Sequence, residues 1–454
     1  MKINTINFEK KEGIPIYRQL YEKLRDDILA GYLKKGDQLP SIRKCEKLLK
    51  ISKTSIERAY DQLLMEGYIQ SIPQKGFFVD VEEEQRKLRR QLVERPLKQS
   101  KVKARYDFRS QTMDKDAFDI SLWKKYLKEV LETESDITTY GDAQGEYALR
   151  LALGRYAYSM RGVFSTPDRM LIGASFQSLL YILCGYIQNT IIGMEESGFS
   201  QAEQVFHDYE FEVVKLSMQT GGVCVRELIE KKVKVLYINA GSMGCDHQPL
   251  TSWKRKELLA WAKKYDAWII EDDHNGELRY HTRLMPCMQG YDMGEHVIYI
   301  GSFSKLLLPS LRISYLIMTP NMQSKYQVQN YGPSASKIEQ LALARYISDG
   351  HLERHVKRLR KRYELKSRSM MSLLKECFPE ADILLEEAGL QLILRFPYEI
   401  DSQQLIDICA QHSIWLNQNA QKDIVLSFAA ISLEEMDEAI HELKALWDPF
   451  LREK

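Results

Sequence analysis

The sequence lacks the long apolar run that a membrane-spanning helix needs. Its longest apolar stretch, LLYILCGYI at residues 179–187, falls short of the roughly 20 residues required to cross a bilayer. The opening segment MKINTINFEKKE has no apolar core of the kind found in signal peptides. We therefore expect a cytoplasmic protein with no membrane partner.

Cysteine is scarce and unpatterned. The 454 residues include 7 cysteines, and no two of them form a Cys-x-x-Cys pair. An odd, scattered set of thiols suits a reducing compartment. We therefore expect neither disulfides nor a structural metal.

The chain has little net charge, but its charge is unevenly distributed. Residues 1–105 contain 24 Lys and Arg against 15 Asp and Glu, and the remainder contains 40 against 48. The N-terminal part is thus +9 and the rest is −8. This asymmetry favours a polyanionic partner for the N-terminal part, with an ordinary solvated basic surface as the alternative.

The first eighty residues have the spacing of a helix-turn-helix. Apolar residues recur on one helical face over residues 16–28, and Gly31 is expected to end this helix. Ser41 and Ser52 are expected to cap a second and a third helix, joined by a short turn around Lys50. This arrangement is typical of a DNA-binding domain.

Several side chains of this segment suit DNA contacts. The third helix begins with short polar and cationic residues that fit base edges and phosphates in a major groove. The stretch SIPQKGFFV predicts a hairpin with Lys75-Gly76 at its tip, which would form a basic wing. The predicted DNA-binding residues are Arg43, Lys53, Thr54, Ser55, Arg58 and Lys75.

The segment PSIRKCEKLLKISKTSIERAYDQLLMEGYI, followed by KGFFV, resembles the winged helix-turn-helix of the GntR family of bacterial repressors. The resemblance covers residues 12–80 and implies operator DNA as a partner. Lys50 stands where the family usually has glycine, so we expect a left-handed lysine there at modest cost. A winged helix used only for protein contacts is the alternative.

We divide the chain into a winged helix-turn-helix at residues 1–80, a charged linker at 81–105 and a larger C-terminal region. The linker is highly charged and has almost no apolar periodicity. It is expected to be a solvated tether, with contact to DNA phosphates as the alternative. A chain of 454 residues is in any case too long for one core.

Beyond residue 106, helical patterns alternate with short apolar strands. The predicted strands are DRMLIGA, NTIIGME, KVKVLYIN, AWIIEDD and HVIYIGSFS. This alternation predicts an α/β domain with a largely parallel sheet, whose ligand lies at the carboxyl ends of the strands.

Polar residues follow three of these strands. Asp272 ends one strand, Ser302, Ser304 and Lys305 follow another, and Ser175 stands at the head of a predicted helix. Pyridoxal phosphate would use such groups: a lysine for its aldehyde, a carboxylate for its ring nitrogen, and helix amides with serine and arginine for its phosphate. Alternatively, Lys305 is a surface lysine and Asp272 a helix cap.

In this order, these segments resemble a fold-type I aminotransferase domain, with a large domain at residues 106–345 and a small α+β subdomain at 346–454. TYGDAQGEYALRLALGRY, IIEDDHNGELRY and GSFSKLLLPSLRISYL are among the segments that carry the likeness. The fusion of this domain to a GntR-type winged helix resembles the MocR family of transcriptional regulators.

The resemblance implies roles for individual residues. Lys305 would form a Schiff base with pyridoxal 5′-phosphate, and Asp272 would pair with its pyridine nitrogen. Tyr140 would reach the phosphate bound by the neighbouring subunit, which implies a homodimer. The other implied contacts are Ser302, Ser304 and Arg312 to phosphate, and Ser175 and Phe176 from the adjoining loop.

Three departures from the family affect the site. His274 stands where the family has a tyrosine that bonds the phenolic oxygen of the cofactor; a histidine also donates, but its charge varies near neutral pH. The run NAGSMGCDH at residues 239–247 lacks two prolines and replaces the usual polar pair with Ser242 and Met243. Val425 stands where aminotransferases carry an arginine that clamps a substrate carboxylate.

Two other groups of residues are expected to be structural. His351 and His355 have the i, i+4 spacing of metal ligands, but no third ligand is evident and the resemblance gives them a structural place. Trp253, Trp261 and Trp268 are expected to pack in the core.

The sequence therefore predicts a homodimeric transcriptional regulator that binds operator DNA and senses pyridoxal 5′-phosphate or an adduct of it. Because the substrate-binding positions depart from the family, we expect no enzyme activity. The alternatives are an active aminotransferase with an accessory DNA-binding head, and a degenerate domain that only dimerises.

Overall fold

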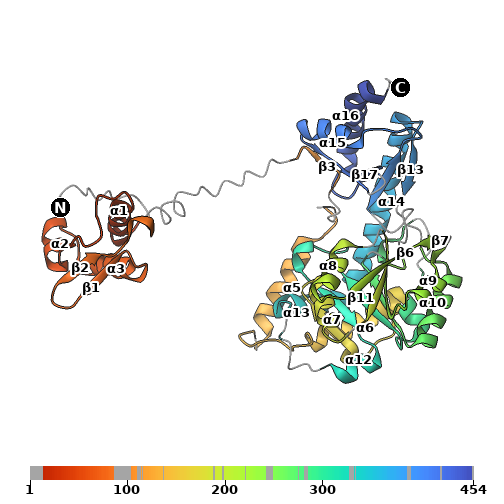
Figure 1. Ribbon diagram of the computed structural model, residues 1–454, viewed down its shortest axis with the longest axis horizontal. Coiled ribbons are helices and arrows are strands. Elements are labelled where there is room, and N and C mark those ends of the chain that lie inside the picture. Colours follow the sequence, from red (N-terminus) through yellow and green to blue (C-terminus); the bar gives the residue numbers. More distant parts are fainter. Residues whose placement is uncertain are drawn as a thin grey trace. The chain divides into compact units, whose positions relative to one another are not determined.

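The computed structural model describes residues 14–85, 104–109, 114, 116–135, 137–187, 190–196, 199–219, 221–241, 249–274, 276–280, 285–326, 332, 334–385, 390–419 and 422–451. The chain divides into two compact units, Met1–Lys101 and Val102–Lys454, which are described separately (Figure 1). None of the described helices combines the length and apolar character needed to cross a bilayer.

The N-terminal unit is a three-helix domain with a hairpin. The elements are α1 (Ile16–Leu29), α2 (Ile42–Leu49), α3 (Lys53–Met65), β1 (Ile69–Ile72) and β2 (Gly76–Val79), with β1 and β2 antiparallel. The expected face of α1 is buried at Leu20, Leu24 and Ile28. These side chains form one core with residues of α3 and the hairpin.

The predicted caps and the predicted turn are confirmed. The Ser41 hydroxyl accepts from the Lys44 N–H at 3.3 Å, and the Ser52 hydroxyl accepts from the Ser55 N–H at 3.2 Å. Lys50 ends α2 in the left-handed region with φ of 52°. A side chain is strained in this conformation, which explains why glycine suits the position.

The C-terminal unit is built on a seven-stranded sheet in the order β4-β12-β11-β10-β9-β5-β6. Neighbouring strands are parallel except that β12 runs antiparallel to both of its neighbours. All five predicted strands are present, whereas β6 and β12 were not predicted. The strands are β4 (Met170–Gly173), β5 (Ile191–Glu195), β6 (Glu212–Leu216), β9 (Val235–Ile238), β10 (Trp268–Asp273), β11 (Val297–Ser302) and β12 (Ser314–Ile317).

Helices cover both faces of this sheet. Because successive strand residues point to opposite faces, Ile270 packs in the cluster that includes α7, α8 and α12, whereas Ile269 packs in the cluster that includes α10 and α11. Burial on both faces explains why these strands read as continuous apolar runs. The helices of this region are α5 (Ile120–Thr133), α6 (Tyr147–Arg161), α7 (Phe176–Cys184), α8 (Ser200–Asp208), α9 (Val225–Glu230), α10 (Ser252–Tyr265), α11 (Met288–Asp292), α12 (Pro320–Lys325) and α13 (Lys337–Ser348).

Short elements connect these layers. They are the hairpin strands β7 (Met218–Gln219) and β8 (Gly222–Val223), and the 3₁₀ turns η2 (Pro167–Arg169), η3 (Gly276–Leu278) and η4 (Pro309–Leu311).

A long helix, α14 (His351–Cys377), leads into a smaller layer at the C-terminal end. Its four-stranded sheet has the order β13-β14-β17-β16, and the chain segment β3 (Tyr106–Asp107) pairs in parallel with β15 (Ile414–Trp415). The remaining elements are β13 (Asp382–Leu385), β14 (Gln391–Arg395), β16 (Asn417–Gln418), β17 (Ile424–Ser427), α15 (Ser402–Gln411) and α16 (Leu433–Leu451). The division at residues 80, 105 and 345 stays a prediction.

One expectation about the core is wrong. Trp261 is buried and Trp268 is half-buried, but Trp253 is 67% exposed in the first turn of α10. Lys254 lies over the Trp253 ring, with its amine 5.0 Å from the ring centre. The Trp253 ring thus contacts a neighbouring lysine on the surface and stays largely exposed instead of packing in the core.

Candidate functional site

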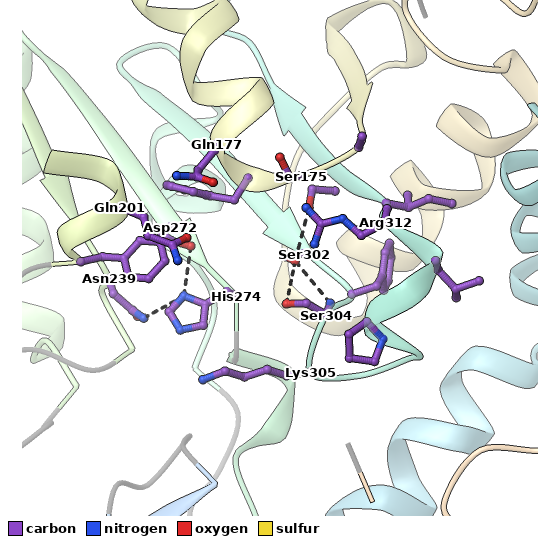
Figure 2. Close-up of a pocket in the computed structure, with 18 of the residues that line it drawn as sticks. Ser175, Gln177, Gln201, Asn239, Asp272, His274, Ser302, Ser304, Lys305 and Arg312 are labelled. Atoms are coloured by element: carbon purple, nitrogen blue, oxygen red, sulfur yellow. Dashed lines mark hydrogen bonds and ion pairs between the residues drawn. The ribbon is translucent and has the colours of Figure 1, made fainter. Parts of the chain in front are cut away.

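A cavity of about 400 Å³ lies at the carboxyl ends of the parallel strands β9, β10 and β11. It brings together eight of the nine residues predicted to bind a cofactor, which come from segments far apart in the chain (Figure 2). Tyr140 does not line the cavity and is 94% exposed. The eight residues in the lining are Ser175, Phe176, Asp272, His274, Ser302, Ser304, Lys305 and Arg312.

Asp272 is one of two buried acidic residues in the described lining of the cavity, the other being Glu195. The Asp272 carboxylate accepts a hydrogen bond from the Tyr237 hydroxyl at 2.5 Å and contacts His274 Nδ1 at 3.1 Å. Burial, together with the Asp272 charge, raises the pKa of Tyr237 well above its ordinary value. Tyr237 therefore stays protonated and acts as a donor to the carboxylate.

His274 has two polar neighbours at the same ring nitrogen. Nδ1 lies 3.1 Å from the Asp272 carboxylate and 3.4 Å from the Asn239 side-chain nitrogen. An ionised carboxylate only accepts, so a proton on Nδ1 serves the shorter contact to Asp272. The ring also stacks on Phe199, with centroids 6.3 Å apart and planes 26° apart.

Ser175 caps the nine-residue helix α7 at the edge of the cavity. Its hydroxyl accepts from the Ser178 N–H and the Ser178 hydroxyl accepts from the Ser175 N–H, both at 3.1 Å. This capping box fixes the first turn, whose free amides and helix dipole favour an anion. Phe176 follows in the lining and packs edge-to-face on Tyr237, with centroids 6.1 Å apart.

A cluster of hydroxyl groups and Arg312 completes this side of the cavity. The Ser302 hydroxyl lies 3.1 Å from that of Ser304 and 3.3 Å from that of Ser314, its partner across β11 and β12. Arg312 follows η4 in the left-handed region, with φ of 53°. A non-glycine residue held in this conformation marks a position that the surrounding structure fixes.

Lys305 lies in the turn after β11 and is half-buried. In Figure 2 its amine points toward the part of the cavity that holds His274. Lys305 thus follows the buried strand β11 and lies next to Ser302 and Ser304, at the end of the sheet where a ligand is expected.

Sequence reasoning missed several residues of the lining. The positions of Tyr237 and Asn239 could have been predicted, because side chains alternate along a strand and these two share a face of the sheet with Val235. The remaining side chains come from elements whose mutual placement no local pattern reveals. The additional polar residues are Gln177, Glu195, Gln201, Tyr237, Asn239, Ser314 and Gln391.

The structure describes Val425 but not the departure at Ser242 and Met243. Val425 is buried in β17, opposite Ile393 of β14. Ser242 and Met243 lie outside the described residues. Among the described residues of the lining, the Lys and Arg side chains are those of Lys305 and Arg312.

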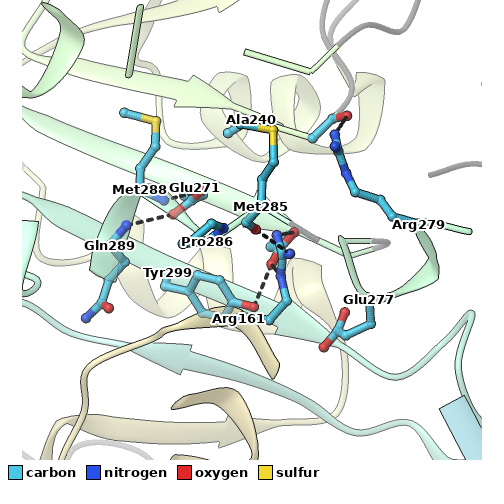
Figure 3. A network of polar contacts seen from close by, with 12 residues as sticks. Arg161, Ala240, Glu271, Glu277, Arg279, Met285, Pro286, Met288, Gln289 and Tyr299 are labelled. Carbon is cyan, nitrogen blue, oxygen red and sulfur yellow. Dashed lines mark hydrogen bonds and ion pairs between the residues drawn. The ribbon is translucent and has the colours of Figure 1, made fainter. Parts of the chain in front are cut away.

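A second polar network lies on the other face of β10 (Figure 3). The Arg161 guanidinium donates to both Asp273 carboxylate oxygens, at 2.7 and 3.0 Å, and the Tyr299 hydroxyl donates to Asp273 at 2.8 Å. Burial alone would raise the pKa of Asp273, but the charge and hydrogen bonds of Arg161, together with the hydrogen bond from Tyr299, outweigh burial and lower it. Gly276 is required here, because a Cβ would lie 2.0 Å from an Asp273 oxygen.

The lining suits pyridoxal 5′-phosphate. The cavity offers an amine at Lys305, a buried carboxylate at Asp272, and hydroxyl and guanidinium groups beside the first turn of α7. These match, in turn, an aldehyde, a ring nitrogen and a phosphate. The donor set of the lining therefore fits this cofactor.

The predicted DNA-binding residues lie on α2, α3 and the hairpin. Arg43, Thr54 and Lys75 are exposed, and Lys53 is exposed and paired with Glu57 at 3.3 Å. Ser55 instead lies partly buried, with its hydroxyl 2.8 Å from that of Ser52. Arg58 is also exposed, with its guanidinium 6.0 Å from the centre of the Tyr17 ring.

His351 and His355 differ in environment although they lie on one helix. His355 is fully buried, with Nε2 2.7 Å from the Leu306 carbonyl oxygen. His351 is half-buried and stacks on Tyr346. Among the described residues, no group of three or more His, Cys, Asp or Glu is arranged to hold a metal ion.

Comparison with known proteins defines the class. Residues 16–79 match the bacterial regulatory proteins of the gntR family. The fold of the C-terminal unit resembles that of an archaeal alanine:glyoxylate aminotransferase, with a TM-score of 0.69 and 22% identity over 77% of this chain and 92% of that one. The protein is thus a transcriptional regulator with a GntR-type winged helix and a fold-type I aminotransferase-like domain.

Two relatives align over nearly the whole chain. The chain is 32% identical to the uncharacterized HTH-type transcriptional regulator YdeL of Bacillus subtilis, over 96% of this chain and 97% of that protein. It is 28% identical to the probable rhizopine catabolism regulatory protein MocR of Rhizobium meliloti, over 96% and 94%. The chain belongs to the MocR-type regulators of the GntR family.

Proposed function

We propose that the C-terminal unit binds pyridoxal 5′-phosphate, or an adduct of it, and that this binding alters operator binding by the N-terminal unit. The observation that carries the proposal is the convergence of Lys305, Asp272 and Arg312 on one cavity. Bound there, the cofactor would supply an aldehyde for a lysine amine.

Each side chain of the cavity would have a distinct task. Lys305 would hold the aldehyde carbon, and Asp272 would keep the ring nitrogen protonated. Tyr237 and His274 would orient the Asp272 carboxylate by their hydrogen bonds. Ser302, Ser304 and Arg312 would bind phosphate, and Ser175 and Phe176 would add contacts from the adjoining loop.

We infer that the domain senses rather than turns over its ligand. Val425 is an aliphatic side chain buried in β17, so this position supplies no cation for a substrate carboxylate. Without a fixed carboxylate, an amino acid would not be oriented for proton transfer. Turnover of a common amino acid with an oxo-acid by the purified protein would contradict this inference.

Tyr140 supports a homodimer with shared sites. Its side chain is 94% exposed and lies outside the cavity lining. In a dimer it would reach the phosphate held by the partner. A Tyr140→Phe protein should therefore bind pyridoxal 5′-phosphate more weakly while keeping its fold.

The cofactor assignment is tested at Lys305. Purified protein mixed with pyridoxal 5′-phosphate should develop the visible absorbance of the lysine-bound cofactor, and borohydride should fix the label on Lys305. Lys305→Ala should abolish both signals, with Lys256→Ala, on α10, as an exposed-lysine control. A Lys305→Ala protein that binds and responds to the cofactor as the parent does would contradict the assignment.

The DNA-binding surface is tested at Lys53. If Lys53 contacts a phosphate, Lys53→Ala should weaken operator binding and reduce the salt dependence, log K against log salt, by roughly one unit. Lys23→Ala is a matched control, because Lys23 also forms an exposed i, i+4 pair, with Asp27 at 2.7 Å. Equal binding by the parent and Lys53→Ala would remove Lys53 from the interface.

A further inference from the structure

A buried histidine holds the turn that carries Lys305. The His355 Nε2 atom, from α14, lies 2.7 Å from the carbonyl oxygen of Leu306, the residue that follows the lysine. A carbonyl oxygen only accepts hydrogen bonds, so Nε2 must carry the proton. His355 is fully buried, which shields this contact from water.

The other ring nitrogen defines the charge state of His355. Nδ1 is buried and has no hydrogen-bond partner among the described residues. The ring also meets Phe118 edge-to-face, with centroids 5.7 Å apart. A second proton would place a charged donor without an acceptor in an apolar environment, which is costly. The geometry therefore defines a neutral histidine with its proton on Nε2.

Two sets of hydrogen bonds fix the turn that carries Lys305, one within the turn and one from His355. The Leu306 and Leu307 N–H groups both donate to the Phe303 carbonyl, at 3.1 and 2.8 Å. Both leucine side chains are fully buried. The His355 contact adds a donor from α14 to the Leu306 carbonyl, so the direction of this carbonyl depends on α14.

We infer that His355 is a positioning residue: its Nε2–H group fixes the Leu306 carbonyl and thereby directs the Lys305 amine into the cavity. The inference rests on the proposed function, in which Lys305 holds the cofactor aldehyde. Because α14 continues to Cys377 beside the small sheet, the same contact links the lysine turn to that layer.

The protonation of His355 is tested in the protein without cofactor. Nitrogen-15 spectra of histidine-labelled protein, with His355→Gln to assign the signal, should show a neutral ring protonated on Nε2 at neutral pH. A ring protonated on Nδ1, or a charged ring, would overturn the inference whether or not the cofactor binds.

The positioning role is tested with three variants. His355→Leu fills the site with an apolar side chain but removes the Nε2–H donor. Pyridoxal 5′-phosphate should then bind about tenfold more weakly, and borohydride should label less Lys305. His355→Gln retains an N–H donor and should recover most of both signals. His351→Leu, on the same helix, should leave both signals unchanged.

The outcomes separate this inference from the proposed function. A parent that takes up no cofactor on Lys305 contradicts the proposed function, while the nitrogen-15 spectra still report on His355. A folded His355→Leu protein with parental affinity and labelling overturns the positioning role. If His355→Leu does not fold, His355→Gln decides: cofactor affinity as weak as that of Lys305→Ala would contradict the rescue by an N–H donor.

Discussion

Asp272 and Asp273 are consecutive residues of β10 with the same side chain, yet they lie in different settings. Asp272 faces the cavity and contacts a tyrosine hydroxyl and a histidine. Asp273 faces the core and forms a two-bond ion pair with Arg161. The period of two along a strand separates the faces, and the partner then decides whether a carboxylate serves a ligand or the fold.

The two carboxylates differ in how many of their hydrogen-bond positions are occupied. A carboxylate has about four positions for hydrogen-bond donors. Arg161 and Tyr299 occupy three on Asp273, and the Arg161 guanidinium neutralises its charge. Asp272 instead contacts a tyrosine hydroxyl and a histidine ring. The charge of Asp272 thus remains available to a cationic group in the cavity.

The largest effect is expected at Asp273. Asp273→Asn leaves the Arg161 guanidinium buried without its countercharge, which should lower the free energy of unfolding by about 3–5 kcal/mol. Urea denaturation followed by circular dichroism measures this change. The double variant Arg161→Met with Asp273→Leu should recover much of the loss, because a buried ion pair can be replaced by packed apolar side chains. An Asp273→Asn protein as stable as the parent would remove the contrast between the two aspartates.

A smaller effect, on binding rather than folding, is expected at Asp272. Asp272→Asn keeps an acceptor for Tyr237 but loses the charge that would pair with the ring nitrogen. A hydrogen bond to a charged group is worth about 1.5–3 kcal/mol, so cofactor affinity should fall about 10- to 100-fold. Spectroscopic titration with pyridoxal 5′-phosphate gives the dissociation constant. If Asp272→Asn instead loses stability as Asp273→Asn does, both aspartates are structural.

The features predicted from sequence were those that depend on neighbouring residues. Ser41 and Ser52 cap helices through amides three residues away, and Lys50 takes the conformation that a short turn imposes. The strand ends that carry Asp272 and Lys305 were readable for the same reason, since apolar runs mark buried strands.

Contacts between residues far apart in the chain could not be predicted from the sequence. Arg161 and Asp273 are 112 residues apart, and Tyr237 is 35 residues from Asp272. No local pattern pairs such residues; only the sheet order and the helix placement bring them together. The exposure of Trp253 was missed because a helix tolerates an exposed aromatic ring that contacts a neighbouring lysine.

The last prediction concerns Glu277, which lies near Asp273. Burial, and then the charge of Asp273, raises the pKa of Glu277 to about 7, and its Oε2 atom has no hydrogen-bond partner among the described residues. The folded protein therefore holds this proton more tightly than the unfolded chain does. The stability from this group is complete below the ordinary glutamate pKa of about 4.3 and is lost as the pH rises toward 7, by at most about 1.4 kcal/mol per pH unit.

Glu277→Gln cannot ionise, so its stability relative to the parent should increase as the pH rises from 5 to 8. Urea denaturation at several pH values measures this difference. Glu271→Gln is the matched control: Glu271 is also buried, but it accepts from the Met288 and Gln289 N–H groups at 2.7 and 3.0 Å, and the amide would leave one donor without an acceptor. It should therefore destabilise the protein even at pH 8. If Glu277→Gln loses stability at pH 8 as Glu271→Gln does, Glu277 is an ionised partner of Arg161, and Arg161 then has two ionised carboxylates beside it, Asp273 and Glu277, instead of one.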